Sequence, residues 1–146
     1  LFLSSENTLM INAPLVCDDT LQTNDIARIY PDGSFTILGR KDNVINSGGI
    51  KVQAEEIERL LQSSIPVPFV ITSVPDRRLG QAVTLLIEGQ MEISALGTKL
   101  ESVLASYYRP KYIYTVNHIP QTGNGKINRK ECRVLAESLQ LLGRQE

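Results

Sequence analysis

Residues 120–129 form a polar segment whose residue types could hold an anion. Lys126 directly follows Gly125, and Arg129 comes three residues later. Glycines let backbone N–H groups approach an anion closely, and a lysine ammonium is a compact charge that can meet a phosphoryl or carboxylate oxygen. The same residues would also suit a solvated turn before a helix. A P-loop of the NTPase type is not supported, because no Ser or Thr follows Lys126 and no glycine lies five residues before Gly125.

Two further polar segments could take part in chemistry. Residues 39–52 contain Gly48 and Gly49 close to Lys51, an arrangement that would let a narrow ligand pass the backbone. The alternative is an ordinary tight hairpin. Residues 23–25, Thr-Asn-Asp, precede a predicted strand, and a short acid there could accept hydrogen bonds from a sugar diol. The alternative is that Asp25 only caps a turn.

The composition is that of an ordinary globular protein and excludes several classes. The 146 residues are 42% hydrophobic and carry a formal net charge of −1, which argues against a protein that coats nucleic acid. Two widely separated cysteines, Cys17 and Cys132, and a single histidine make a zinc site very unfavourable. The same pair fits a reducing cytoplasm. No apolar run approaches the roughly 20 residues of a membrane span.

Hydrophobic periodicity and turn residues predict a β segment followed by a small α+β domain. Residues 1–38 are predicted to be all β, with a strand over 9–16 and a hairpin over 26–38. From residue 43 onward a small mixed sheet with helices packed on it is predicted. Its elements are a hairpin at 44–52, a helix at 54–62, strands at 67–74 and 81–88, a helix at 92–107, a strand at 112–116, and a helix at 129–142 that follows the loop 120–128.

Taken together and in order, the three polar segments resemble the C-terminal third of the adenylate-forming enzymes: acyl-CoA synthetases, peptide-synthetase adenylation domains and luciferases. The pattern Pro120-x-Thr122-x-x-Gly125-Lys126-x-x-Arg129 is similar to the family's catalytic-lysine motif. Residues 39–52, followed by Glu-Ile-Glu at 56–58, resemble its hinge and thioester-forming loop. Residues 23–25 resemble its Thr-Gly-Asp at the nucleotide ribose.

The resemblance implies a two-step reaction in which a carboxylic acid is activated with ATP to an acyl-adenylate and then transferred to CoA. It implies that residues 1–38 are the end of a large N-terminal domain, 39–42 a hinge and 43–146 a C-terminal lid domain. It also assigns roles: ribose binding to Asp25 and Arg40, the hinge to Asp42, the pantetheine channel to Gly48 and Gly49, and the catalytic ammonium to Lys126.

Parts of the family's pattern differ or are missing. Leu21 and Gln22 stand where an aromatic residue and an arginine are common, and Asn24 replaces glycine, which is tolerable because Asn also adopts left-handed conformations. The phosphate loop rich in Ser, Thr and Gly, the acyl pocket and the ligands of the Mg²⁺ that accompanies ATP have no counterpart in the chain. No metal site is therefore expected here, and the chain alone is expected to be inactive.

Within the family, the compact segments between motifs and the Thr-Asn-Asp variant most resemble the o-succinylbenzoate–CoA ligases of menaquinone biosynthesis. No carrier-protein motif follows the last helix before Glu146, which favours a stand-alone ligase. The alternatives are another acyl- or aryl-CoA ligase, a peptide-synthetase adenylation domain, or a non-catalytic α+β module that binds a phosphorylated partner. The oligomeric state is not predicted.

Overall fold

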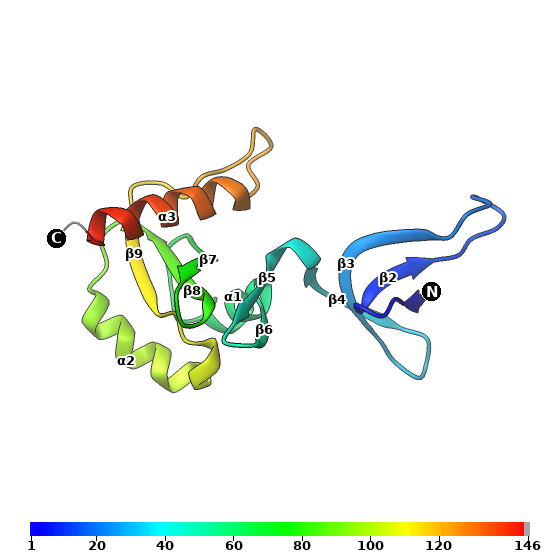
Figure 1. Cartoon of the computed structure of the whole chain (residues 1–146), viewed down its shortest axis with the longest axis horizontal. Coiled ribbons are helices and arrows are strands. Elements are labelled where there is room, and N and C mark those ends of the chain that lie inside the picture. Colours follow the sequence, from blue (N-terminus) through cyan, green and yellow to red (C-terminus); the bar gives the residue numbers. More distant parts are fainter. Residues whose placement is uncertain (145–146) are drawn as a thin grey trace. The chain divides into compact units, whose positions relative to one another are not determined.

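The computed structural model describes residues 1–144, and the chain forms two compact units. The first unit is Leu1–Val44, and the second begins at Ile45 (Figure 1). In the part of the chain that the structure describes, no helix is both long and apolar enough to cross a membrane.

The first unit is a four-stranded antiparallel sheet in the order β1-β2-β3-β4. The hairpin between β3 and β4 turns at residues 31–34, where Gly33 has a φ of 88° and donates its N–H to Tyr30 O at 2.9 Å. Glycine adopts that conformation without steric cost. The elements are β1 (Phe2–Leu3), β2 (Thr8–Ile11), β3 (Leu21–Ile29), β4 (Phe35–Arg40) and a 3₁₀ helix, η1 (Lys41–Asn43).

Two predictions for this unit are wrong. The strand expected over 9–16 ends at Ile11, because the N–H groups of Val16 and Cys17 both bind Ala13 O in a turn and Pro14 has no N–H to offer a ladder. The strand expected to begin at Ile26 begins at Leu21, so residues 23–25 lie inside β3 and Asp25 does not cap a turn. There the Thr23 hydroxyl donates to Leu9 O on the neighbouring strand at 2.9 Å.

The second unit is an α+β domain built on one mixed sheet, which confirms the predicted fold class. The strand order is β6-β5-β8-β7, and β9 pairs in parallel with β8. The other pairings of β8 are antiparallel. The strands are β5 (Val44–Ser47), β6 (Ile50–Gln53), β7 (Phe69–Asp76), β8 (Gly80–Glu88) and β9 (Tyr112–Val116). The helices are α1 (Ala54–Leu61), α2 (Ile93–Val103), the 3₁₀ turn η2 (Ser106–Tyr108) and α3 (Arg129–Arg144).

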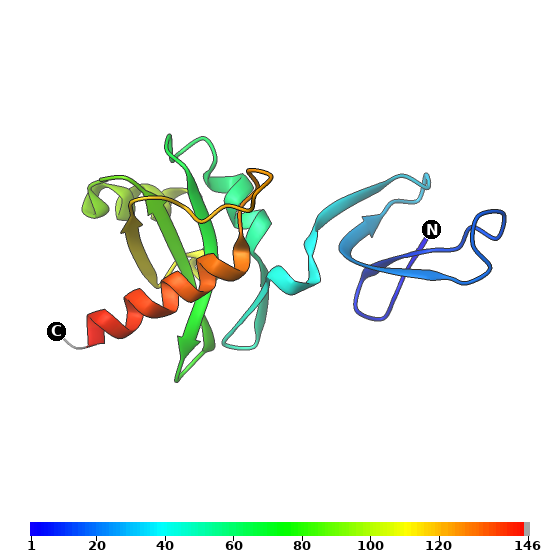
Figure 2. The same cartoon turned by 90° about the horizontal axis from the view of Figure 1, so that it is seen from above.

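Helices cover both faces of this sheet, with α1 and α2 on one side and α3 on the other (Figure 2). Residues 82–87 of β8 are buried in an unbroken run, as expected for a strand covered on both faces. Alternate side chains therefore enter two separate cores. Val83, Leu85 and Ile87 pack with α1 and α2, whereas Ala82 and Leu86 pack with α3, including its fully buried Cys132.

The second helix is shorter than the predicted 92–107, because it ends at Val103 and a 3₁₀ turn follows. The guanidinium of Arg109 folds back over this end. Its Nε donates to Leu104 O at 3.0 Å and its Nη2 donates to Glu101 O at 3.1 Å. These bonds satisfy carbonyl groups that lose their helical partners when a helix stops.

Candidate functional site

The loop that carries Lys126 is a small, hydrogen-bonded hairpin. Gln121 and Ile127 form an antiparallel bridge, Thr122 N–H donates to Lys126 O at 2.7 Å, and Gly125 N–H donates to Thr122 O at 3.0 Å. Gly125 has a φ of 78°, a conformation that a side chain would strain. The Lys126 side chain is exposed. Within residues 1–144 its ammonium makes no hydrogen bond or ion pair, so it is available to an incoming anion.

Two contacts fix the base of this hairpin to the domain. Asn128 caps α3, since its Oδ1 accepts the N–H of Glu131 at 3.2 Å. Arg129 forms a two-point ion pair with Glu58 of α1, with Nη1–Oε1 at 2.7 Å and Nη2–Oε2 at 2.9 Å. The pKa of the Arg129 guanidinium is raised: burial acts to lower it, but the hydrogen bond and charge of Glu58 outweigh that effect. The ion pair joins the end of the Lys126 loop to the helix that follows β6.

Gly48 and Gly49 form the two-residue turn between β5 and β6. Their φ angles are 61° and 85°, as a type I′ hairpin turn requires. Gly48 N–H donates to Leu79 O at 2.9 Å. A Cβ on Gly48 would lie 3.1 Å from the Leu79 side chain, whereas Gly49 has open space around it. The segment is therefore a tight hairpin, and the role of Gly48 and Gly49 toward a ligand stays a prediction.

A pocket of about 370 Å³ opens beside this turn, and sequence reasoning did not find it. Gly48 and Ile50 line it from the hairpin, and Tyr107, Arg109 and Lys111 line it from the segment between α2 and β9. An aromatic ring and two cations beside a glycine turn suit a ligand with a flat ring and phosphate groups. The only sequence signal was the spacing of these three side chains at alternate positions, which no motif marked.

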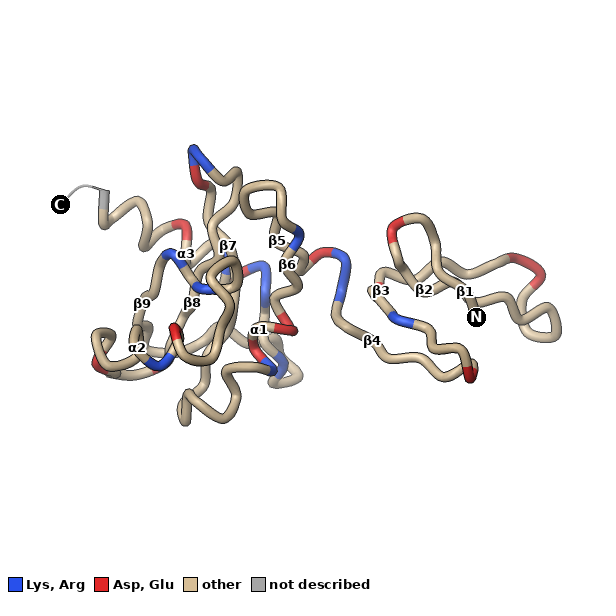
Figure 3. The backbone as a smooth tube through the Cα atoms, turned by 90° about the horizontal axis from the view of Figure 1, so that it is seen from below, with Lys and Arg blue, Asp and Glu red and all other residues tan. Residues whose placement is uncertain are grey.

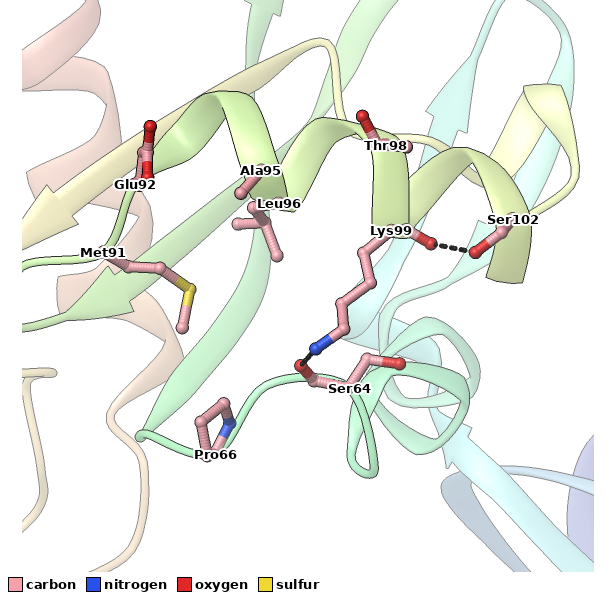
Figure 4. A pocket seen from close by; sticks show the side chains of 9 residues that line it. All are labelled: Ser64, Pro66, Met91, Glu92, Ala95, Leu96, Thr98, Lys99 and Ser102. Carbon is pink, nitrogen blue, oxygen red and sulfur yellow. Dashed lines mark hydrogen bonds between the residues drawn. The ribbon is translucent and has the colours of Figure 1, made fainter.

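A second pocket, of about 490 Å³, lies between α2 and residues 64–66. Figure 4 shows its lysine turned toward the Ser64 carbonyl, where Lys99 Nζ donates at 3.3 Å. Met91 and Leu96 also line the pocket (Figure 4). Its wall offers one cation and no aromatic ring, whereas the pocket beside Gly48 is lined by two cations and a tyrosine ring. The pocket beside Gly48 is therefore the stronger candidate for a phosphorylated ligand.

In the first unit, Asp25 and Arg40 face each other across β3 and β4. Arg40 Nη1 lies 3.4 Å from Asp25 Oδ1, and both side chains are partly exposed. The fold thus brings the two residues predicted to bind the nucleotide together. Asp42 lies in η1 and is exposed. The ribose role of the pair and the hinge role of Asp42 stay predictions.

The charge distribution agrees with the near-neutral sequence. Lys and Arg are interspersed with Asp and Glu along the backbone of both units (Figure 3). No group of His, Cys, Asp and Glu that could hold a metal ion occurs among residues 1–144. The candidate residues of the second unit are an exposed lysine on a tight hairpin, a glycine turn and a basic pocket beside that turn.

No protein-family model matches the chain. Curated relatives do: triostin synthetase I of Streptomyces triostinicus is 38% identical over 126 residues, 83% of this chain and 24% of that protein. The acyl-coenzyme A synthetase ACSM1 of Mus musculus is 32% identical over 143 residues, 91% of this chain and 25% of that protein. The 2-succinylbenzoate–CoA ligase of Lactococcus lactis is 33% identical over 113 residues, 77% of this chain and 25% of that protein.

Solved structures agree with these relatives. An AMP-forming acyl-CoA synthetase-like protein from Dyadobacter fermentans matches with a TM-score of 0.61 and 30% identity, over 90% of this chain and 39% of that one. ATP-bound MatB from Rhodopseudomonas palustris shares the fold, with a TM-score of 0.73 and 24% identity, over 84% of this chain and 25% of that one.

The homologues and structural neighbours of this chain are thus acyl- and aryl-CoA ligases, together with triostin synthetase I. The chain spans about a quarter of the length of the curated relatives it matches.

Proposed function

We propose that this chain is the C-terminal portion of an acid–CoA ligase that activates a carboxylic acid with ATP and transfers the acyl group to CoA. The ligase homologues and neighbours support the reaction class. In this proposal residues 1–38 belong to a large domain, 39–42 form the hinge, and residues from 43 onward form the lid. The remaining ATP site, the acyl pocket and the Mg²⁺ ligands lie in the part of the enzyme outside this chain.

The observation that carries the proposal is the exposed Lys126 ammonium on a hydrogen-bonded hairpin, an ammonium that makes no ion pair or hydrogen bond within residues 1–144. In the first step, a carboxylate oxygen attacks the α-phosphorus of ATP, and the bond to pyrophosphate breaks. Two anions must approach, and negative charge gathers on the α-phosphate. An ammonium placed between them by a preorganised loop stabilises that charge without having to break other contacts first. Lys126 supplies this ammonium in the proposal.

In the second step, the CoA thiol loses its proton to solvent, the thiolate sulfur attacks the acyl carbon, and AMP leaves with the bonding electrons. The Gly48–Gly49 turn would line the channel for the pantetheine arm, because a turn without side chains leaves room for a narrow chain. The adjoining pocket would take the nucleotide end of CoA. Arg109 and Lys111 offer charge to its phosphates, and Tyr107 offers a ring to its base.

In the first unit, the paired Asp25 and Arg40 would bind the ribose of ATP. A carboxylate accepts hydrogen bonds from a diol, and the guanidinium holds that carboxylate in place. Asp42, exposed in the short η1, would serve as the hinge residue between the two steps. Both assignments extend the resemblance of the motifs in which these residues stand.

For the acid, 2-succinylbenzoate is the first substrate to test, which would place the enzyme in menaquinone biosynthesis. The Lactococcus relative with that specificity supports this choice. A peptide-synthetase adenylation module is the second candidate, supported by the 38% identity with triostin synthetase I. The two differ in the acceptor, since a module transfers to the thiol of a carrier domain and not to free CoA.

Pyrophosphate exchange in the complete enzyme tests the proposal. Lys126→Ala should slow acid-dependent ATP–pyrophosphate exchange by about 10²–10³-fold, the usual cost of losing one donor to a developing oxyanion. Lys130→Ala, which removes an exposed lysine from the first turn of α3, is the matched control and should leave exchange unchanged. Exchange near the wild-type rate in a folded Lys126→Ala enzyme would refute the assignment. The 146-residue chain alone should show no exchange.

A further inference from the structure

Asp76, the last residue of β7, lies at the junction of two segments that wall the pocket beside Gly48. Its side chain is only 5% exposed. Its Oδ1 accepts the N–H groups of Arg78 and Leu79 at 2.9 and 3.0 Å. Its Oδ2 lies 2.6 Å from the Nζ of Lys111. One carboxylate thus binds the turn between β7 and β8 with one oxygen and a pocket lysine with the other.

The turn held by Asp76 packs against Gly48. Leu79 O accepts the Gly48 N–H at 2.9 Å, and the Leu79 side chain occupies the space above Gly48, 3.1 Å from where a Cβ would stand. Leu79 itself lines the pocket. The position of the glycine turn therefore depends on the conformation of residues 77–79, which Asp76 fixes.

Lys111 lines the same pocket from the segment between α2 and β9, and its side chain is 45% exposed. Its own N–H donates to Val83 O at 2.9 Å, which fixes its backbone to β8. Its ammonium also lies 5.6 Å from the centre of the Tyr112 ring. With the carboxylate buried and the ammonium partly exposed, an anion can approach Lys111 from solvent while Asp76 still holds it. The hydrogen bond from Lys111 lowers the pKa of Asp76 to about 2, so the carboxylate is ionised at neutral pH.

We propose that Asp76 is a positioning residue for the pocket beside Gly48, holding the glycine turn through Leu79 and orienting the Lys111 ammonium toward a phosphate of the bound ligand. Asp76 does not contact the reacting atoms. This inference rests on the proposed function in one respect, the identity of the ligand, which is CoA if that function is correct. The linkage of the two pocket walls through one carboxylate is a property of the chain itself.

The first test is structural and needs only this chain. Asp76→Ala removes both sets of contacts, and the Gly48 amide should exchange with solvent at least roughly tenfold faster by NMR, because the turn that accepts its hydrogen bond loses its cap. Asp76→Asn keeps an acceptor for the turn and should preserve most of the Gly48 protection. Asp32→Asn is the matched control, since Asp32 also caps a turn, with its Oδ1 accepting Ser34 N–H at 2.9 Å in the other unit. Unchanged Gly48 exchange in Asp76→Ala would overturn the role of the turn.

The second test measures the thioester step of the complete enzyme. Asp76→Asn leaves Lys111 in the pocket but replaces its buried counter-charge with an amide. The KM for CoA should then rise by roughly tenfold, while ATP–pyrophosphate exchange stays at the wild-type rate. An unchanged KM for CoA would overturn the orienting role, and an equal loss in both steps would show a merely structural one.

The two tests separate this inference from the proposed function. If the wild-type enzyme activates an acid but does not transfer it to CoA, the proposed function fails. The Gly48 exchange rates then still decide whether Asp76 links the two walls.

Discussion

The ion pair between Glu58 and Arg129 is the contact through which the Lys126 loop is fixed to α1. Replacing Arg129 and replacing Glu58 should lower the stability of the domain by different amounts. Glu58 Oε1 makes no hydrogen bond within the described residues, and only the ion pair with Arg129 Nη1 accompanies it. Arg129→Met would therefore leave a carboxylate oxygen without any partner. Glu58→Gln would keep a neutral acceptor beside the guanidinium. We expect Arg129→Met to destabilise the domain more than Glu58→Gln.

The magnitude follows from the burial of the pair. The Arg129 and Glu58 side chains are 28% and 16% exposed, between surface pairs worth about 0.2–1 kcal/mol and buried pairs whose disruption costs about 3–5 kcal/mol. We expect Arg129→Met to lower the free energy of unfolding by about 3 kcal/mol and Glu58→Gln by about 1.5 kcal/mol. At about 4–8 °C per kcal/mol for a domain of this size, the Arg129 variant should melt at least about 12 °C lower.

The assay is urea denaturation of the chain followed by circular dichroism, with an unchanged m-value required for each comparison. The double variant Glu58→Gln/Arg129→Met completes a mutant cycle and should show a coupling of about 1 kcal/mol or more. Arg133→Met, four residues further along α3 and exposed, is the matched control. A coupling below about 0.3 kcal/mol, or equal small effects of both single variants, would refute the reasoning.

Three further perturbations give distinct expectations. Gly48→Ala should destabilise the second unit by roughly 1–3 kcal/mol in a thermal melt, because a left-handed φ of 61° and contact with the Leu79 side chain both oppose a Cβ. Gly49→Ala is the control, since a Cβ on Gly49 would meet open space. Equal losses of stability in the two variants would mean that the contact with Leu79 adds nothing. The ion pair of Asp76 and Lys111 should contribute constant stability above about pH 4, and this contribution should fall as the pH drops toward 2. The reason is that the pKa of Asp76 is about 2 in the folded state, against an ordinary 3.8. The same dependence of stability on pH in Asp76→Asn and in the wild type would contradict this. Asp42→Pro in the complete enzyme should slow acyl-adenylate formation and thioester formation unequally, because proline fixes φ at about −65° where a hinge must change it. Equal losses of rate in rapid-quench measurements of the two steps would argue for an ordinary surface turn.

The sequence predicted the second unit better than the first, and the reason is burial. In β8 a run of buried residues that is apolar except for Thr84, and in α1 a one-sided apolar stripe, are required by a core on each face of the sheet. In the first unit the apolar side chains do not mark the strands. Leu15 and Val16 suggested a strand but are 100% and 87% exposed, whereas β3 carries polar residues on both of its faces and was recognised only from Ile26 onward.

The candidate site shows a similar division. Lys126 and Gly48 could be selected as candidates because glycines and charges at short spacing are visible in one stretch of sequence. Lys111 and Asp76 were missed, since they are 35 residues apart and meet only because β9 returns beside β8. A single acid at a strand end and a single lysine before another strand carry no local pattern that would pair them.

The two cysteines offer a way to observe the units separately. Cys17 is exposed in the first unit, and Cys132 is fully buried in the second, where desolvation raises the pKa of its thiol to about 11. Because the thiolate is the reactive form, a maleimide dye added at neutral pH should attach to Cys17 and spare Cys132 while the domain stays folded. A spectroscopic label can therefore be placed on one unit of the natural sequence without engineering, and any reorientation between the units becomes accessible to fluorescence.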